Sequence, residues 1–527
     1  MQYDALIIGA GHNGLVCAWY LARAGLKVRI VEKLPVVGGA AVTEEFHPGF
    51  RNSVAAYTVS LLQAQIIRDM DLTRHGLQII NRPMENFLPV DDHNYLLLGG
   101  DLASRQKQIA KFSTRDAGQL PAWLDRLERL ARLFRGLLLK TPVNADGGVN
   151  DLFRLLSDAR HLHGLGLQGQ RDLLALIAGS AGDMLDRNFD SDPIKAILGF
   201  DSIVGSFISP YTPGSGYVLL HHVIGEANGK QGAWGHAIGG MGAITEAMAR
   251  ACMALGVEIS VETPVQKVLV NEGKASGIVL KTGDTLFAKR IVSNLNPRLL
   301  YTRLVDADAL DGEFLTHMQH WKCHSASLRM NVALSELPDF SCLPGKQVQP
   351  HHGAGIIIGP SLQYMEQAYI DAKQNGWSGR PVVELVIPST YDPTLAPAGK
   401  HVASLFCQHF AYALPDGRDW DDAREEVADL VIKTVTDYAP NFRDAVIARS
   451  ILTPPDLEHR FGLTGGDIFH GALTPEQLYS ARPILGHADY RAPIKNLYMC
   501  GSGTHPGGGV SGAPGYNAAR EILKDTS

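Results

Sequence analysis

Apolar and polar positions recur along this chain with two different periods, and the changes of period mark its predicted elements. An apolar run of strand length, residues 5–8, leads into a glycine-rich turn, and an alanine-rich segment of helical character follows. A second apolar run covers Val28 to Val31. A strand, a tight turn, a helix and another strand in this order predict the βαβ unit that opens a Rossmann-type sheet.

A second stretch of the same kind begins near Gly232 and ends at residue 294. Its helical run ends before Gly256, which is the predicted C-cap. Strand-like runs follow over residues 257–261, 265–270, 277–280, 285–288 and 290–294. No apolar strand leads into Gly239 to Gly242, so these glycines are interpreted as a helix start and not as a second nucleotide loop.

The last stretch, residues 496–520, combines a short strand, a glycine-rich crossing and a helix that begins near Gly512. The strand and the alanine-rich helix on either side of the glycines argue against a disordered tail.

The segments between these stretches have other patterns. Residues 101–200 are predicted to be largely helical, with a stripe of leucines at positions 124, 127, 130 and 133. Such stripes usually pack into a core, so we predict core contact in preference to contact with a membrane. Residues 300–480 mix a helix near 423–437 with strand-like runs over 356–358, 382–387 and 401–406.

The turn after the first strand contains a dinucleotide-binding fingerprint, G-x-G-x-x-G. It comprises Gly9, Gly11, His12, Asn13 and Gly14. The first glycine allows the tight turn, the second lets a pyrophosphate approach the backbone, and the third lets the helix pack on the strand. The helix N-terminus then offers free N–H groups and a partial positive charge to the phosphates.

The residues after the second strand favour FAD over NAD. Glu32 ends that strand, 18 positions after Gly14, where an acid accepts hydrogen bonds from the adenosine ribose. A glycine pair follows soon after, as in the glutathione-reductase-like FAD proteins that this segment resembles. The arginine that often follows this pair in amine oxidases and desaturases is missing here. The predicted cofactor contacts in this segment are Glu32, Lys33, Gly38, Gly39, Ala40 and Ala41.

The carboxyl-terminal stretch is predicted to hold the flavin end of FAD. In the wider FAD class this strand ends in Gly-Asp, whereas here Gly501 and Ser502 replace the carboxylate with a neutral hydroxyl. The helix that begins near Gly512 and Ala513 is expected to point its N-terminus at the flavin. A helix N-terminus stabilises the negative charge of a reduced flavin.

Composition and charge exclude several classes. The formal net charge of −6 over 527 residues, without a basic block, argues against a nucleic-acid partner. Six scattered cysteines without a C-x-x-C motif fit free thiols in a reducing compartment. With no signal peptide and no apolar run of about 18 residues, we expect a cytoplasmic protein. No metal-ligand motif is visible, so no metal is expected.

Several motifs make the chain similar to the phytoene desaturase and carotenoid isomerase family of FAD proteins, over nearly its whole length. They are residues 38–45 (GGAAVTEE), 209–223 (SPYTPGSGYVLLHHV), 232–242 (GAWGHAIGGMG), 465–472 (GGDIFHGA) and 500–512 (CGSGTHPGGGVSG). The closest branch is one named for a pyridine nucleotide-disulphide oxidoreductase domain. In such proteins the strands after residue 256 return the chain to the adenine, which adds Val265 to the cofactor contacts. The resemblance also implies that His505 lies near the flavin ring.

Disulfide reduction with NADPH is rejected. A disulfide reductase needs a reactive cysteine pair near the flavin, but residues 33–130 contain no cysteine. A second Rossmann fingerprint for NADPH is also missing, because the glycines at 353 and 355 precede an apolar run instead of following one.

The resulting fold prediction is α/β, with a glutathione-reductase-like, Rossmann-type FAD-binding domain and an α+β substrate domain built from insertions. The FAD domain is expected to comprise residues 1–60, 226–300 and 481–527. Residues 61–225 and 301–480 are expected to form the substrate domain.

Two function classes stay open, and flavin amine oxidation is a third option that the missing arginine after the glycine pair disfavours. In the first, the protein dehydrogenates an apolar, long and unsaturated substrate by hydride transfer to flavin N5, with electrons passing to oxygen or a quinone. In the second, it is a reduced-flavin isomerase or an FAD-bound regulatory protein without net redox turnover. Histidine is the natural base near neutral pH. The predicted catalytic residues are His505, His236 and His470.

Overall fold

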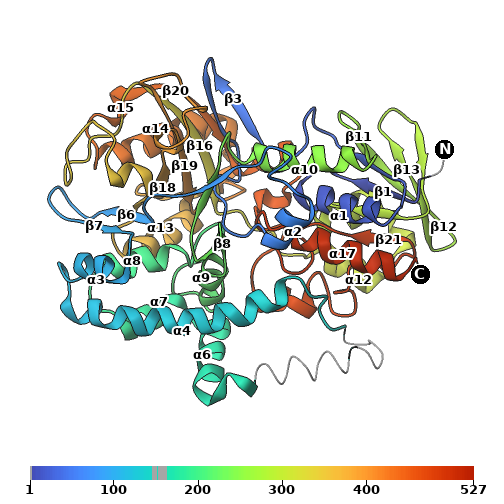
Figure 1. The fold of residues 1–527 in the computed structure, drawn as a ribbon, viewed down its shortest axis with the longest axis horizontal. Helices are drawn as coiled ribbons and strands as arrows, with labels where there is room; N and C mark the ends of the chain where they lie inside the picture. Colours follow the sequence, from blue (N-terminus) through green and yellow to red (C-terminus); the bar gives the residue numbers. More distant parts are fainter. Residues whose placement is uncertain (1–2, 145–150, 152–162, 527) are drawn as a thin grey trace.

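The computed structural model describes residues 3–144, 151 and 163–526. A five-stranded parallel sheet forms one half of the molecule (Figure 1). Its strand order is β11-β2-β1-β15-β21, and every neighbouring pair is parallel. The strands are β1 (Ala5–Ile8), β2 (Val28–Val31), β11 (Glu258–Ser260), β15 (Ile291–Ser293) and β21 (Leu497–Met499). The sheet therefore joins the three predicted stretches of chain, and the predicted α/β fold class is confirmed.

Helices cover one face of this sheet, and a smaller sheet covers the other. The helices are α1 (His12–Arg23), α10 (Gly242–Ala254) and α17 (Ala513–Lys524), which share a core with Ala5 and Ile7. Leu6 and Ile8 point to the opposite face. That face is covered by β12 (Val265–Asn271), β13 (Lys274–Leu280), β14 (Thr285–Phe287) and α12 (Gly312–Gln319). Because both faces are covered, β1 is apolar at every position.

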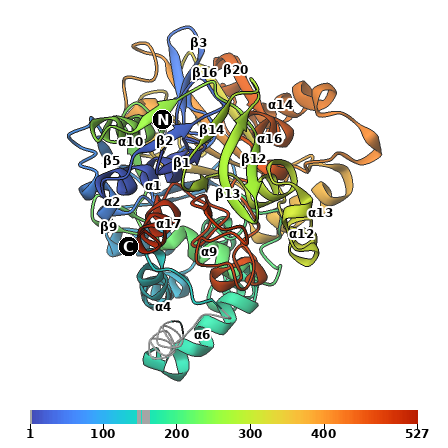
Figure 2. The ribbon, with the colours of Figure 1, turned by 90° about the vertical axis from the view of Figure 1, so that its right-hand side faces the viewer.

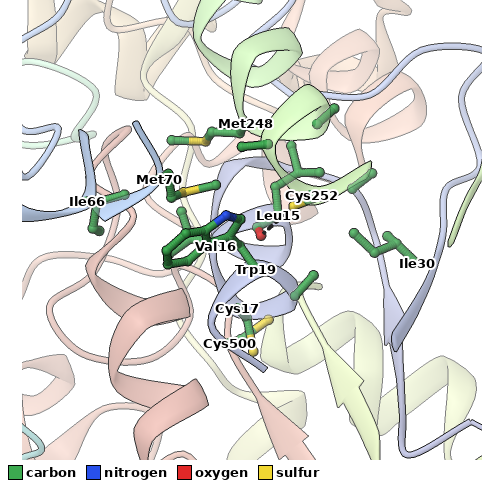
Figure 3. Packing of buried hydrophobic residues seen from close by; sticks show 14 of the residues in the cluster. Leu15, Val16, Cys17, Trp19, Ile30, Ile66, Met70, Met248, Cys252 and Cys500 are labelled. Carbon is green, nitrogen blue, oxygen red and sulfur yellow. Dashed lines mark hydrogen bonds between the residues drawn. The ribbon is translucent and has the colours of Figure 1, made fainter. Parts of the chain in front are cut away.

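The core under the helices is built around Trp19 of α1. Met70 and Met248 pack near its indole ring, and Cys17 contacts Cys500 (Figure 3). The Cys252 thiol donates to the carbonyl oxygen of Leu15 at 3.2 Å. All six cysteines lie in the described part of the chain, and each is a free thiol.

A seven-stranded mixed sheet dominates the other half. Its order is β20-β16-β19-β18-β17-β6-β7, and only the β17–β6 pair is parallel. The strands are β6 (Asn86–Pro89), β7 (Tyr95–Leu98), β16 (Ser327–Leu334), β17 (Gly355–Ile358), β18 (Val382–Val386), β19 (His401–Gln408) and β20 (Val446–Leu452). One face packs against α14 (Trp420–Thr436). The strands predicted near 356, 382 and 401 and the helix near 423 are all present.

A helical layer lies below the two sheets in both views (Figures 1 and 2). It comprises α3 (Leu102–Ile109), α4 (Thr114–Leu138), α6 (Gly166–Ala178), α7 (Ala181–Asn188), α8 (Asp192–Phe200) and α9 (Ser215–Val223). Leu127 and Leu130 of α4 are buried in a core that includes residues of α7, α8 and α9, as the leucine stripe predicts. Within the described residues, no helix is both long and apolar enough to cross a bilayer.

Short elements connect these layers. The hairpins are β3 (Thr43–His47) with β4 (Phe50–Ser53) and β8 (Glu226–Ala227) with β9 (Lys230–Gln231), and β5 (Ile79–Asn81) forms an antiparallel pair with the distant β10 (Gly235–Ala237). Further helices are α2 (Ala64–Asp69), α11 (Pro297–Leu299), α13 (Leu362–Asn375), α15 (Phe442–Ala445) and α16 (Pro454–Phe461). The β5–β10 pair links two segments that the sequence assigns to different domains, and the domain boundaries stay a prediction.

The strand-like runs predicted over residues 265–270, 277–280 and 285–288 form one three-stranded sheet. β13 begins at Lys274 and pairs with β12 as well as with β14. The turn before it has positive φ at both Glu272 and Gly273, which is the type I′ geometry that joins antiparallel strands. An Asn-Gly or Asp-Gly turn would have been recognised in the sequence, whereas Glu-Gly was not.

Candidate functional site

The glycine fingerprint forms a tight loop at the end of β1. Gly9 has φ of +98°, which turns the chain sharply, and Gly11 caps the start of α1. A Cβ at Gly14 would lie 2.3 Å from the carbonyl oxygen of Gly9. The first turn of α1 therefore packs against the loop at a distance that only glycine permits.

Glu32 joins this loop to the second strand. Its side chain is 5% exposed, and its two oxygens accept from the backbone N–H groups of Ala10 at 2.7 Å and Leu34 at 2.9 Å. A carboxylate has further lone pairs available for the hydroxyls of a ribose. Glu32 thus shapes the glycine loop in addition to the ribose role predicted for it.

A cavity of about 340 Å³, here called the nucleotide cavity, runs along this loop. The carbonyl ends of β1 and β2 border it, together with the segment between β11 and β12 and residues 458–464. Eleven of the sixteen predicted cofactor contacts line it: Gly9, Gly11, His12, Asn13, Glu32, Lys33, Gly38, Gly39, Ala40, Val265 and Ser502.

The other five predicted contacts lie outside this lining. Gly14 and Gly501 support the loop from behind, since a Cβ at Gly501 would lie 2.7 Å from the carbonyl oxygen of Asn294. Gly512 and Ala513 form the buried start of α17, and a Cβ at Gly512 would meet Ile66. Ala41 lines a second cavity instead.

Two lysines are the cations that line the nucleotide cavity. Lys33 and Lys281 line it, and no arginine does among the described residues. The Lys33 side chain is exposed overall, although partial burial of its ammonium group lowers the pKa of that group. Its Nζ also donates to the carbonyl oxygen of His459 at 3.2 Å. These two lysines are the charges that the cavity can offer to phosphates.

Unpaired polar atoms show that the cavity fits FAD. His12 Nε2, Asn13 Oδ1 and His470 Nδ1 are buried without a hydrogen-bond partner. Asn13 Nδ2 donates to the Ser502 hydroxyl at 3.1 Å. Buried polar atoms are normally paired, so a bound group with its own donors and acceptors is expected here. The glycine cradle and Glu32 fit the diphosphate and ribose of FAD.

Two more cavities adjoin the nucleotide cavity. The central cavity, of about 150 Å³, shares His12, Ala40, His470 and Ser502 with it. The inner cavity, of about 230 Å³, shares Leu61 and His221 with the central cavity. Both are lined mainly by apolar and aromatic side chains. The three cavities thus form a series from the glycine loop to α4 and α6.

The structure separates the three predicted catalytic histidines. His470 lies where the nucleotide and central cavities meet. His505 lines the inner cavity, and its Nε2 lies 3.0 Å from the carbonyl oxygen of Leu137. His236 lines none of the three cavities. Its Nε2 lies 2.8 Å from a carboxylate oxygen of Asp392, and both side chains are buried.

The cavity histidines are neutral near pH 7. Burial lowers the pKa of His470 to about 3 and that of His505 to about 4. Burial also lowers the pKa of His12 and His222 to about 4 and that of His221 to about 3. Bases this weak take up a proton poorly at pH 7, so these rings serve best as hydrogen-bonding and shaping groups.

Sequence reasoning missed three residues that shape this site. Asn294 lines the nucleotide cavity, and its Nδ2 donates to the carbonyl oxygen of Gly9 at 3.3 Å. Tyr57 lines the central cavity. Arg482 is fully buried behind His470 and Ser502. The only sequence signal for Asn294 was its place at the end of a predicted strand.

Replacing Glu32 with alanine is expected to weaken FAD binding without abolishing it. Charge-assisted hydrogen bonds are worth about 1.5–3 kcal/mol, which corresponds to a rise in Kd of about ten- to a hundredfold. Titration of apoprotein with FAD, followed by flavin fluorescence, measures it. Glu246→Ala, an exposed site on α10, is the control. An unchanged Kd in Glu32→Ala would contradict the ribose role.

Comparison with known proteins relates the chain to flavoproteins. Residues 14–328 match the family described as flavin containing amine oxidoreductase. The chain is 44% identical over 548 residues to pyridine nucleotide-disulfide oxidoreductase domain-containing protein 2 of Rattus norvegicus, covering 99% of this chain and 94% of the relative. It is 25% identical over 545 residues to 4,4'-diapolycopene oxygenase of Methylomonas sp, covering 99% and 97%. The predicted resemblance to this branch and to carotenoid-modifying enzymes is thus confirmed.

A solved structure has the same fold. Wild-type putrescine oxidase bound to putrescine aligns with a TM-score of 0.60 at 16% identity, covering 100% of this chain and 99% of that chain.

Proposed function

This chain belongs to the flavin containing amine oxidoreductase family, and we propose that it dehydrogenates an apolar, unsaturated substrate with its FAD. The observation that carries the proposal is the series of cavities. The central and inner cavities continue from the nucleotide cavity through shared residues and are lined mainly by apolar side chains. The relative named 4,4'-diapolycopene oxygenase also supports a long unsaturated substrate.

The residues of the central cavity position the substrate and exclude water. FAD supplies the hydride acceptor when it is bound, so the protein needs no strong base for that step. Apolar side chains such as Leu61, Val204 and Ile468 line the cavity and favour a ligand that buries hydrocarbon. His470 presents an unpaired Nδ1 at the junction with the nucleotide cavity.

The inner cavity gives a long substrate room beyond the reacting carbon. Phe134, Leu137 and Leu138 of α4 and Ile177 of α6 line it, with His505 on its wall. Leu61 and His221 stand between the central and inner cavities. A substrate that extends through both would be held along its length, which fixes its reacting carbon.

The flavin of the holoprotein is expected to lose its absorbance when mixed anaerobically with an isoprenoid polyene, and to stay oxidised with NADPH. Hydride transfer from nicotinamide needs a site that holds it in a near-attack geometry, and among the described residues only the G-x-G-x-x-G pattern at residues 9–14 directly follows a strand and opens a helix. Stopped-flow absorbance measures both reactions. Bleaching within a second by sub-millimolar NADPH would contradict the proposal. Product formed only after prior reduction would indicate an isomerase instead.

A variant where the central and inner cavities meet tests whether a long polyene extends through both of them. Leu61 borders both the central and the inner cavity, so the larger side chain of Leu61→Trp should reduce the space for a long polyene and slow flavin reduction by it at least about tenfold. Leu255→Trp, at a site 43% exposed at the end of α10, is the matched control and should react as the wild type does.

A further inference from the structure

The aromatic walls of the central cavity are backed by buried arginines. Tyr57, Phe406 and Trp234 line the cavity. The guanidinium carbon of Arg329 lies 4.5 Å from the ring centre of Tyr57 and 5.2 Å from that of Phe406. The guanidinium carbon of Arg82 lies 5.8 Å from the ring centre of Trp234. Neither arginine lines the cavity, so each lies behind an aromatic wall.

The strand register of the seven-stranded sheet creates this arrangement. Arg329 on β16 pairs with Phe406 on β19, which pairs in turn with Glu384 on β18. The three side chains therefore form one row on the same face of the sheet. Glu384 accepts a hydrogen bond from the Tyr57 hydroxyl and lies 3.7 Å from Arg82 Nη1. The carboxylate thus ties Tyr57 to Arg82.

Together, the buried side chains of Arg329, Arg82 and Glu384 carry more positive than negative charge. Arg329 is 2% exposed, and it donates to the Ser404 hydroxyl at 2.5 Å, while its Nε and Nη1 have no partner. Two guanidinium groups thus face one carboxylate, Glu384. The nearby Asp201 does not restore the balance at neutral pH, because burial and the charge of Glu384 raise its pKa to about 8.

The cavities themselves provide no negative charge. Among the described residues, no Asp or Glu lines the central or the inner cavity. Their histidines are neutral near pH 7 because burial lowers the pKa of each. An ammonium ion that entered would leave water without meeting a counter-ion, which is costly in a low-dielectric site.

Aromatic walls would ordinarily attract an ammonium. The negative faces of aromatic rings bind cations, and aromatic cages recognise ammonium ligands in this way. Here guanidinium groups already lie over the rings of Tyr57, Phe406 and Trp234, and they repel a second cation at short range. A neutral conjugated ligand makes the same apolar contacts without this repulsion.

We propose that Arg329 and Arg82 are specificity-determining residues that keep ammonium ions out of the central cavity. Its ligand is then an uncharged unsaturated molecule and not an amine, although the family is described by amine oxidation. This inference rests on the proposed function only in assigning the central cavity to the substrate.

Two probes with one carbon skeleton test the inference. Geraniol is neutral, whereas geranylamine is an ammonium ion at pH 7. The oxidised holoprotein is titrated with each, and the perturbation of flavin absorbance gives the two dissociation constants. The wild type should bind geraniol at least about tenfold more tightly than geranylamine, the size expected when a desolvated cation meets like charge. Arg329→Met leaves Arg82 and Glu384 as a neutral pair and should reduce this ratio about tenfold.

A matched control separates this effect from the general loss of an arginine. Arg380 lies 4.9 Å from the ring centre of Tyr364, is exposed, and lines neither cavity. Arg380→Met should keep the wild-type ratio. The wild-type ratio needs no variant, so it tests the inference even if Arg329→Met fails to fold.

The outcomes distinguish this inference from the proposed function. Equal or tighter binding of geranylamine by the wild type would overturn the inference, as would binding of neither probe. An unchanged ratio in a folded Arg329→Met would overturn the role of Arg329. Because binding is measured without turnover, a polyene that fails to reduce the flavin would overturn the proposed function and leave the probe ratio unaffected.

Discussion

The Gly11→Ala variant is expected to fold but to lose its affinity for FAD. A Cβ at Gly11 would lie 2.8 Å from Asn294 Nδ2, the far end of a side chain that can move aside. The same methyl group would occupy the lining of the nucleotide cavity where the second fingerprint glycine lets a pyrophosphate approach the backbone. Crowding against a rigid backbone and a bound pyrophosphate is expected to cost about 3 kcal/mol or more, the upper end for overpacking, which corresponds to a loss of at least about a hundredfold in affinity.

Gly118→Ala is the control for this substitution. It lies in α4, where a Cβ would meet nothing within 4 Å. Both variants are purified, their circular dichroism is compared, and the apoproteins are titrated with FAD. A folded Gly11→Ala variant that binds FAD as the wild type does would show that the fingerprint is not the cofactor site. The loss should also exceed that of Glu32→Ala, since Glu32 contributes hydrogen bonds and does not obstruct the cavity.

The nucleotide end was predictable because its determinants are local. Gly9, Gly11 and Glu32 lie within 24 consecutive positions, and each acts through the backbone of a strand–turn–helix unit. Such a unit forms in much the same way whatever follows it. The lining of the nucleotide cavity by Val265 and Ser502 came from the family resemblance, since these residues are distant in sequence.

The surroundings of the central cavity could not be predicted from the sequence, because they depend on contacts between residues far apart in the chain. His236 was a candidate base on its motif alone, but its partner Asp392 lies 156 positions away. Arg329, Phe406 and Glu384 become neighbours only through the register of three strands. No local pattern encodes that register, so the buried charges behind the aromatic walls of the central cavity could not be predicted from the sequence.

Burial also decides which histidines can act as bases. His470 and His505 lie in distinctive glycine-rich motifs, which is why the sequence favoured them. Their lowered pKa follows from the desolvation of imidazolium inside the fold, a property that residue type and spacing do not contain. His470 lies at the junction of two cavities, where its buried, unpaired Nδ1 can form a hydrogen bond with a bound group.

The variant Arg482→Met is expected to lose about 3–5 kcal/mol of unfolding free energy, because it leaves several buried carbonyl groups without a donor at about 1–3 kcal/mol each. Arg482 is fully buried. Its guanidinium donates to five backbone carbonyl oxygens, two of which are those of Phe469 and Ser502, each at 2.8 Å. Burial lowers its pKa to about 10, so it stays charged at neutral pH. Methionine fills much of the volume but leaves the carbonyl groups without donors.

The loss should extend to the cofactor, because Arg482 ties the segment that contains His470 to the strand end that contains Ser502. Denaturant unfolding of the holoprotein measures the stability, and retained flavin measures the site. Arg482→Lys keeps the charge but loses the planar fork, so it should fall between methionine and wild type. Arg132→Met, 76% exposed on α4, should change stability by less than about 0.5 kcal/mol. If Arg482→Met unfolds like Arg132→Met and keeps its flavin, the carbonyl cluster does not depend on this cation, and the link between the two segments must come from their packing alone.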